Sequence, residues 1–289
     1  MRVLVLGGTG SIGATVVDSL IARKHEVVGL ARSKRAADRL AAAGASVLAG
    51  DLRQPLEWID ATSNVDAVVQ SASAFAADDE SVEGHILDLL LQRLGATGRP
   101  QSLLYTGGCW LYGATGDSIA TEESPFDPLP VFSWAVAQVN DVRAAKHIRG
   151  VVIHPAMVYE RDGGVFARFK RDLDERGRVR VVGGEGVRWP LVHRRDIGAL
   201  YALALEGARP GAVYNGATVE SLPVGAIARA MAHRAGVTAP PATQTVDEAA
   251  AELGEWARGY GLDQQMSGAK ARRELGWVPE HPDPLADIG

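Results

Sequence analysis

Cysteine is almost absent from this chain of 289 residues, since Cys109 is the only one. A single cysteine excludes any disulfide within the chain and is typical of proteins that live in a reducing compartment. We therefore expect a cytoplasmic location. A reactive thiol at Cys109 is conceivable beside its flanking glycine and Trp110, but a small residue that fills the core is the favoured interpretation.

Long hydrophobic runs are also missing, and no apolar stretch approaches the roughly 20 residues of a transmembrane helix. The first expected strand begins close to the first residue, so we expect no signal peptide before the fold. The net charge of −5 argues against general affinity for nucleic acid or for anionic membranes. The histidines show no metal-ligand spacing, so we expect no metal site. The expected partner is a small-molecule substrate, and the sequence leaves the oligomeric state open.

The first thirteen residues, which read MRVLVLGGTGSIG, carry the strongest positive signal. Val3 to Leu6 form an apolar run typical of a buried parallel strand, and a helix is expected from Ser11 to about Arg23. Gly7 permits a tight turn, Gly10 lets the backbone approach a pyrophosphate, and Gly13 lets the helix pack on the strand. The unpaired N–H groups at the start of the helix suit phosphate binding, although an ordinary glycine turn is the alternative. The predicted dinucleotide contacts are Gly7, Thr9, Gly10, Ser11, Ile12 and Gly13.

A basic stretch follows the second expected strand, Glu26 to Ala31. In a dinucleotide fold the end of this strand meets the adenosine ribose, where a carboxylate suits NAD and an arginine suits the 2′-phosphate of NADP. Arg32 and Ser33 stand at this place, and no acidic residue accompanies them. A solvated basic helix start is the alternative, although it is electrostatically unfavourable without an anion. The stretch therefore predicts NADP (NADPH) as the cofactor.

Strands and helices alternate as far as about residue 154. Further strands are expected at 46–49, 65–70, 102–106 and 151–154, and further helices at 36–43, 81–94 and 132–145. Asp51 and Leu52 follow one strand, where Asp51 accepts from the adenine amino group or caps the next helix. Small residues follow another strand and let a cofactor pass close by; they are Ser71, Ala72 and Ser73.

Beyond Pro155 the clean alternation fails, and helical segments near 165–175, 196–207, 223–235 and 268–275 are mixed with short extended pieces. The pattern predicts an α/β fold, a Rossmann-type doubly wound parallel sheet with a small C-terminal substrate-covering lobe. We expect residues 1–155, with returning segments near 190–215, to form the dinucleotide-binding core. The lobe is expected over about 156–190 and 216–289.

Several motifs together resemble the extended short-chain dehydrogenase/reductase superfamily, whose members include NAD-dependent epimerases and dehydratases. They are the glycine turn, Gly50-Asp51-Leu52, the run from Asp66 to Ser73, Tyr112-Gly113, the run from His154 to Tyr159, Val192 to Ile197, and Lys270 to Trp277. The resemblance implies a core that binds NAD(P), with the nicotinamide near Pro155 and a C-terminal lobe that closes over the substrate.

The chain departs from the superfamily at its catalytic positions. Members carry a tyrosine with a lysine four residues later; the tyrosine exchanges a proton with the substrate, and the lysine holds the nicotinamide ribose. Trp134 and Gln138 occupy these two positions here, and no YxxxK occurs anywhere in the chain. The usual serine or threonine falls on Gly108, with Thr106 nearby. This chain is therefore identified as an atypical member, in which Gln138 remains a predicted cofactor contact.

Few residues remain that could donate a proton to a carbonyl. Tyr112, after the fifth strand, is the nearest hydroxyl by family position, and a packing tyrosine is the alternative. Thr106 either orients a substrate oxygen or simply ends a strand. His193 is a second possible donor, although its family position indicates structural contacts.

Two further groups bear on the substrate. Trp110, Trp134 and Trp189, with Phe132, are expected to line an apolar pocket for a hydrophobic or aromatic substrate, or else to pack in the core. The stretch from Arg168 to Arg195 holds nine lysines or arginines. Superfamily members that act on nucleotide sugars grip a diphosphate near here, whereas a solvated basic surface is the commoner explanation of such a run.

The sequence thus favours an NADP-dependent oxidoreductase that transfers a hydride to or from a small, hydrophobic or aromatic carbonyl or conjugated alkene. Two alternatives stay open. One is an enzyme of the nucleotide-sugar epimerase or dehydratase type, and the other is a non-catalytic NADP(H)-binding redox sensor.

Overall fold

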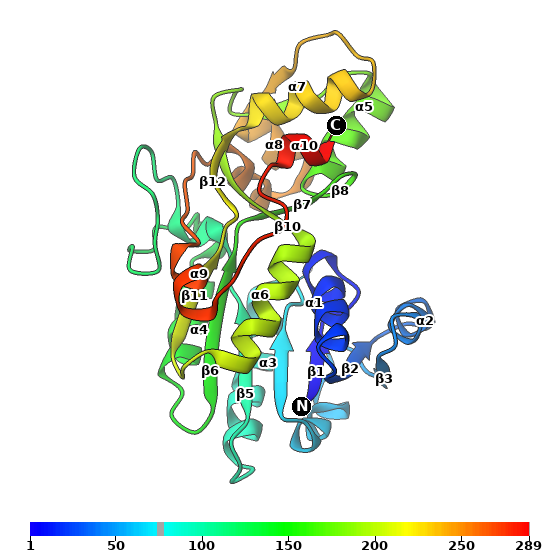
Figure 1. Cartoon of the computed structure of the whole chain (residues 1–289), viewed down its shortest axis with the longest axis vertical. Helices are drawn as coiled ribbons and strands as arrows, with labels where there is room; N and C mark the ends of the chain where they lie inside the picture. Colours follow the sequence, from blue (N-terminus) through cyan, green and yellow to red (C-terminus); the bar gives the residue numbers. More distant parts are fainter. Residues whose placement is uncertain (74–77, 289) are drawn as a thin grey trace. The chain divides into compact units, whose positions relative to one another are not determined.

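A computed structural model describes residues 1–73 and 78–288 (Figure 1). The chain divides into two compact units, which we describe separately. The first unit comprises residues 1–107, 134–153 and 197–214, and the second comprises 108–133, 154–196 and 215–289. The loop 108–133 belongs to the second of these units, and the domain bounds expected from the sequence stay a prediction.

A seven-stranded sheet forms the centre of the first unit. Its strand order is β11-β6-β5-β4-β1-β2-β3, and the pairings from β6 through to β3 are parallel. The strand order reverses between β1 and β4, as in doubly wound folds. The strands are β1 (Arg2–Leu6), β2 (Glu26–Ala31), β3 (Ser46–Ala49), β4 (Ala67–Gln70), β5 (Ser102–Thr106), β6 (Arg149–Pro155) and β11 (Ala212–Gly216). The predicted Rossmann-type sheet is confirmed.

The central strands are mostly apolar, as expected of a parallel sheet whose faces are covered by helices. Val3 to Leu6 of β1 are at most 1% exposed, and α1 packs Val16, Val17 and Leu20 into the same core. The helices of this unit are α1 (Ser11–Ala22), α2 (Lys34–Ala42), α3 (Asp79–Gly95), α4 (Trp134–Ala144) and the greater part of α6 (Arg194–Gly207). Two short 3-10 helices, Pro55–Glu57 and Ile59–Asn64, connect β3 to β4.

The second unit contains two small sheets. One has the order β12-β10-β7-β8, and the other is the parallel pair β13-β9. Its strands are β7 (Met157–Glu160), β8 (Gly163–Gly164), β9 (Arg180–Val182), β10 (Arg188–His193), β12 (Val219–Pro223) and β13 (Ala242–Gln244). Its helices are α5 (Phe166–Arg176), α7 (Val224–Arg234), α8 (Val246–Leu253), α9 (Ala269–Leu275) and α10 (Pro284–Ile288), with 3-10 turns at Cys109–Tyr112, Pro130–Phe132 and Glu255–Gly261. The helices expected near 165, 223 and 268 are present, whereas α8 was not predicted.

Two of the family-like motifs meet inside the second unit. The buried carboxylate of Asp196 accepts hydrogen bonds from the backbone N–H groups of Glu280 (2.8 Å) and His281 (3.1 Å). The indole of Trp277 donates to the carbonyl of Asp196 at 2.9 Å. These bonds hold the C-terminal segment against the start of α6. In the described ranges, no helix has both the length and the apolar character needed to cross a bilayer.

Candidate functional site

The turn between β1 and α1 depends on two of its glycines for close packing. Gly7 has a φ of +80°, and a Cβ there would come within 2.7 Å of the Cα of Ala72. Gly13 lies against the carbonyl of Gly7, and a Cβ on Gly13 would come within 2.1 Å of that oxygen. Only glycine fits at either position. The turn and the helix–strand packing that the sequence assigned to these glycines are therefore present.

Gly10 differs from Gly7 and Gly13 because the space around its Cβ position is largely open. A Cβ at Gly10 would have a single neighbour within 4 Å among the described residues, the oxygen of Gly7 at 3.3 Å. Gly10 is also the N-cap of α1, it offers no side chain to the first N–H groups, and the first turn of α1 has no acidic residue. Gly10 and Ser11 are exposed, while Thr9 and Ile12 are half-buried. A helix start of this kind suits an anion such as a pyrophosphate.

Three arginines of this stretch have no ion-pair partner among the described residues: Arg32 just before α2, Arg35 in its first turn and Arg39 in its last turn. Ser33 caps α2 by accepting from the N–H of Ala36 at 3.2 Å, and Lys34 pairs with Asp38 at 2.7 Å. Within the described part of the chain, by contrast, no ion pair involves Arg32, Arg35 or Arg39. A pocket of about 240 Å³ lies between α1 and α2, and Gly8, Thr9 and Arg39 are among the residues that line it. Positive charge is thus available beside the glycine turn.

The remaining predicted cofactor contacts of this unit make local hydrogen bonds. Asp51 accepts from the N–H of Arg53 at 2.9 Å, which stabilises the turn before the next helical segment, whose N-cap is Gln54 rather than Asp51. Ser71 donates its hydroxyl to the carbonyl of Leu6 at 2.8 Å. Ser73 donates to Asp79 at 2.9 Å. Ala72 packs against Gly7, whereas Pro155, the last residue of β6, belongs to the second unit.

Neither catalytic position of the superfamily holds a group that exchanges a proton near neutral pH. Trp134 is the first residue of α4 and is half-buried. Gln138 is buried on the same helix and accepts a short hydrogen bond from the hydroxyl of Tyr105 on β5. Thr106, the next residue of β5, lies 2.5 Å from the hydroxyl of the fully buried Tyr201. Burial raises the pKa of Tyr201, so Thr106 faces a neutral phenol.

Glu83 on α3 is a buried carboxyl that the sequence analysis missed. It is 8% exposed, and burial together with the nearby charge of Asp79 raises its pKa to about 8. Hydrogen bonds that Ser73 and Tyr105 can donate to the ionised form of this carboxyl oppose the shift. One sequence signal was present: Glu83 stands on the same helical face as Ile86, Leu87, Leu90 and Leu94, which form the apolar stripe of α3.

Tyr112, the predicted proton donor, is buried within the second unit. It is 4% exposed, and its hydroxyl donates to Oδ1 of Asn215 at 2.8 Å. The rings of Phe126 and His154 pack against it at centroid distances of 5.2 and 5.5 Å. The backbone N–H of Asn215 in turn donates to Glu122 at 2.7 Å, and burial raises the pKa of Glu122. Tyr112 therefore has a structural partner, and its role as a proton donor stays a prediction.

His193, the second possible donor, is also buried among packing partners. It is 8% exposed, and its ring packs on His281 at 3.6 Å and on Tyr159 at 5.3 Å between centroids. Its Nδ1 accepts from the N–H of Arg195 at 3.3 Å. Burial lowers the pKa of His193, which keeps the imidazole neutral near pH 7. Such a group is a poor general acid.

A cluster of half-buried aromatic side chains surrounds Trp110 in the second unit. Its indole packs on Phe132 at 5.4 Å, Tyr260 at 5.6 Å and Trp256 at 6.3 Å. It also lies flat on Gly259, where a Cβ would come within 2.4 Å of the ring. Trp110 and Phe132 were predicted to lie together, whereas Trp256 and Tyr260 were missed. We call Trp110, Phe132, Trp256 and Tyr260 the aromatic cluster.

The two other predicted tryptophans have different places. Trp189 is 1% exposed, stacks on Phe169 at 5.8 Å and meets Tyr260 at 5.7 Å, so it is a core residue behind the aromatic cluster. Trp134 belongs to the first unit. Cys109, next to Trp110, is buried, and burial raises the pKa of its thiol to about 12. This thiol is therefore a core-filling group and a poor nucleophile.

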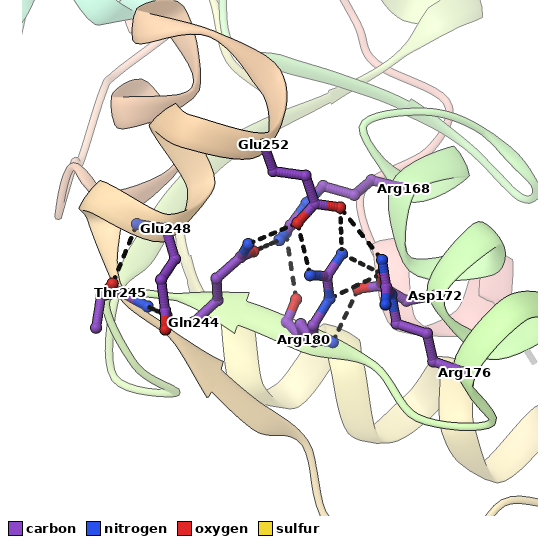
Figure 2. Close-up of polar contacts among 8 residues, drawn as sticks. All are labelled: Arg168, Asp172, Arg176, Arg180, Gln244, Thr245, Glu248 and Glu252. Atoms are coloured by element: carbon purple, nitrogen blue, oxygen red, sulfur yellow. Dashed lines mark hydrogen bonds and ion pairs between the residues drawn. The ribbon is translucent and has the colours of Figure 1, made fainter.

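Five of the nine basic residues between Arg168 and Arg195 are paired with acidic residues of their own unit, and Figure 2 shows two of them, Arg176 and Arg180. Arg180 contacts Asp172 at 2.8 Å and Glu252 at 2.7 Å, and Arg188 forms a close pair with Asp263 at 2.5 Å. Further pairs join Lys170 to Asp174, Arg176 to Asp172 and Glu252, and Arg194 to Glu160. These charges mainly serve the structure, which weakens the diphosphate interpretation.

Arg168 itself is 5% exposed and is held in place by neutral groups. It donates to Gln244 at 2.7 Å and to the carbonyl of Arg180 at 3.2 Å (Figure 2). Its guanidinium lies 5.2 Å from the ring centroid of Tyr260, a cation–π distance. Arg168 therefore contacts one ring of the aromatic cluster, that of Tyr260.

The parallel sheet, with its order reversal and its glycine turn after β1, defines a dinucleotide-binding fold of the extended short-chain dehydrogenase/reductase type. Residues 3–217 match the model of the NAD dependent epimerase/dehydratase family, and the chain belongs to this family. The predicted superfamily is confirmed.

Relatives of known sequence and structure extend over nearly the whole chain. An uncharacterised protein of Schizosaccharomyces pombe is 27% identical over 295 residues, which cover 100% of this chain and 98% of the relative. A 3-diazoavenalumate denitrifying reductase of Streptomyces sp. is 28% identical over 311 residues, with 98% and 97% coverage. The structure of dTDP-glucose 4,6-dehydratase from Streptomyces venezuelae, with NAD bound, superposes with a TM-score of 0.80 at 22% identity and covers 97% of this chain and 92% of that one.

Proposed function

We propose that this protein is an NADP(H)-dependent oxidoreductase that transfers a hydride to or from a small hydrophobic or aromatic carbonyl or conjugated alkene. The observation that carries the proposal is the charge at the end of β2. Arg32 follows this strand without an ion-pair partner among the described residues, and the strand ends in Ala31 rather than in a carboxylate. An unpaired arginine here suits a 2′-phosphate, whereas the ribose hydroxyls of NAD call for an acid.

The residues around the glycine turn fit a dinucleotide. A Cβ on Gly10 would occupy space that is open in this structure, and the N-terminus of α1 offers N–H groups and no competing acid. Arg39 and Thr9 line a pocket beside the same turn. These groups would hold the phosphates, with Arg32 at the 2′-phosphate. When bound, the reduced cofactor supplies the hydride.

The aromatic cluster supports a planar, apolar substrate. Four half-buried aromatic rings offer a large rigid surface at a low entropy cost. In this proposal the cluster binds and orients the substrate, and a hydroxyl of the second unit, Tyr112, gives the carbonyl oxygen its proton. That the Streptomyces relative is named a reductase agrees with this direction of chemistry. The single buried cysteine agrees with a reducing, cytoplasmic setting.

Cofactor titrations test the proposal directly. We expect NADPH to bind the wild type about tenfold or more tightly than NADH, because a charge-assisted contact to phosphate contributes about 1.5–3 kcal/mol. Arg32→Ala should lose most of this preference. Lys34→Ala is the matched control: it also removes a cation from the same stretch, but this one is already paired with Asp38. Equal affinities of the wild type for NADPH and NADH would contradict the NADP assignment.

A second candidate, a non-catalytic NADP(H)-binding redox sensor, is favoured by one specific observation. Trp134 and Gln138 replace the proton-transfer pair, and the hydroxyl of Tyr112 is already bonded to Asn215. Loss of NADPH absorbance with aryl ketones, conjugated enals or quinones separates the two candidates. Turnover with any of them supports the enzyme, and tight NADPH binding without turnover supports the sensor.

A further inference from the structure

Three polar side chains from three elements of the first unit meet in its interior. They are Glu83 of α3, Tyr105 of β5 and Gln138 of α4, with exposed fractions of 8%, 1% and 7%. The hydroxyl of Tyr105 donates to Oε1 of Gln138 in a short hydrogen bond, and Tyr105 is also hydrogen-bonded to the carboxyl of Glu83. Buried polar groups are costly unless they are paired, so this chain of bonds fixes the orientation of all three side chains.

The direction in which these hydrogen bonds are donated follows from the number of protons that each side chain carries. Tyr105 has one O–H group, and it donates this to Gln138, so its oxygen can only accept from Glu83. Glu83 must then be a protonated carboxylic acid. Burial and the charge of Asp79 favour that form, since they raise the pKa of Glu83 to about 8. Glu83 therefore donates to Tyr105, and Tyr105 donates to Gln138.

Gln138 is left with a free donor group. Its Oε1 is occupied by Tyr105, and its Nε2 makes no hydrogen bond within the described residues. This amide nitrogen lies 3.5 Å from the place of a Cβ on Gly84, so the glycine of α3 leaves room for it. Gln138 occupies the position at which the superfamily has its lysine.

We propose that Glu83 and Tyr105 are positioning residues that hold the Gln138 carboxamide as a neutral hydrogen-bond donor for the nicotinamide ribose, in place of the missing lysine ammonium. This inference rests on the proposed binding of NADP(H). An amide has two possible orientations, and a fixed donor such as the hydroxyl of Tyr105, bonded to Oε1, selects the one that presents Nε2. The lysine of the superfamily needs no such partner because all its protons are donors.

The arrangement makes cofactor affinity depend on pH. When Glu83 releases its proton to solvent, the carboxylate accepts the O–H of Tyr105, and Gln138 loses the bond that orients it. The groups that act on Glu83 are Asp79 on its own helix, Ser73 before that helix and Tyr105 on β5, and no charged group of α4 is among the causes of its pKa shift. Loss of one oriented neutral hydrogen bond corresponds to about two- to tenfold in affinity.

The test measures the dissociation constant of NADPH from about pH 6.5 to about pH 9.5, on both sides of the Glu83 transition. The wild type should weaken by about two- to tenfold as the pH rises. Glu83→Gln keeps a donor to Tyr105 but cannot ionise, so its affinity should not fall in this way. Glu80→Gln is the matched control, because it makes the same change at an exposed position of α3 and should keep the wild-type profile. Tyr105→Phe should bind weakly at every pH.

Identical profiles for the wild type and Glu83→Gln would overturn the inference. Failure to bind NADPH at any pH would instead overturn the proposed cofactor. An infrared titration without cofactor gives an independent readout. The carbonyl band of a protonated carboxylic acid should persist at neutral pH in the wild type and in Glu80→Gln, and it should be missing in Glu83→Gln. Its absence from the wild type at neutral pH would also overturn the inference.

Discussion

Gly13 approaches the backbone of Gly7 so closely that a Cβ on Gly13 would lie 2.1 Å from the carbonyl oxygen of Gly7. The first turn of α1 is thereby pressed against the end of β1. Gly10, three residues earlier on the same turn, has only open space around its Cβ position apart from that same oxygen at 3.3 Å. Gly13 is therefore needed for packing, and Gly10 leaves access for a ligand. Substitutions at the two positions should have different effects.

Gly10→Val should abolish detectable binding of NADPH while the protein keeps its fold, because the added side chain fills space that a pyrophosphate would need. Gly13→Ala should instead lower the free energy of unfolding by about 1–3 kcal/mol or more, because its methyl group overlaps a backbone atom. Chemical denaturation and cofactor titration measure the two effects. Unchanged NADPH affinity in a folded Gly10→Val variant would mean that the cofactor binds elsewhere.

Tyr112→Phe tests the proposed proton donor. If the hydroxyl supplies the proton, kcat should fall by about 10²-fold or more with little change in NADPH affinity. The loss of its bond to Asn215 should also destabilise the protein by about 1–3 kcal/mol. Trp134→Phe is the comparison, since an indole shapes a pocket but cannot give up a proton at neutral pH, and it should change KM rather than kcat. Normal turnover by a destabilised Tyr112→Phe would make Tyr112 a purely structural residue.

The first unit was predictable because its signals are local. Continuous apolar runs, a glycine turn and alternating helical patterns gave the bounds of β2, β3 and β5 as they stand in the structure. The second unit has shorter elements with less periodicity. Even so, α8 had a sequence signature that was overlooked, the capping box of Thr245 and Glu248, in which each side chain bonds to the backbone of the other residue.

The environment of the candidate site was less predictable because it depends on residues that are far apart in the sequence. Glu83 stands out on the apolar face of α3, but the sequence around it does not indicate that Tyr105 and Gln138 lie beside it in the fold. The aromatic cluster likewise forms because Gly259 lets Trp110 lie flat on the backbone of a distant turn. The hydrogen-bond partner of Tyr112 and the ring partners of His193, Tyr159 and His281, are also far away in the sequence, and these partners decide between a chemical and a structural role.

The aromatic cluster makes a prediction about substrate binding. Trp110→Ala and Trp256→Ala should raise KM for an aromatic substrate by about tenfold or more and leave NADPH affinity unchanged, because each removes a large apolar contact surface. Trp189→Phe is a suitable contrast, since Trp189 is buried behind the cluster and its replacement should affect stability rather than KM. Equal KM values for the wild type and both alanine variants would remove the cluster from the substrate site.

Glu83 should also make the stability of the protein depend on pH. Its pKa in the folded protein, about 8, is raised above the ordinary value of 4.5 because burial and Asp79 disfavour the charged form. Between these two pH values the folded protein holds a proton that the unfolded chain has released. The contribution of Glu83 to the free energy of unfolding should therefore fall with rising pH, by up to about 1.4 kcal/mol per pH unit, and level off outside this window.

Urea denaturation at a series of pH values measures this contribution as the difference between the wild type and Glu83→Gln, since all other titrating groups are common to both. Relative to the wild type, Glu83→Gln should gain stability steadily as the pH rises from about 4.5 to about 8, because a carboxamide has no proton to lose. Glu80→Gln, at an exposed site of the same helix, should follow the wild type throughout. A constant difference between the wild type and Glu83→Gln across this range would show that Glu83 ionises at an ordinary pH and that its carboxyl is not the protonated donor to Tyr105.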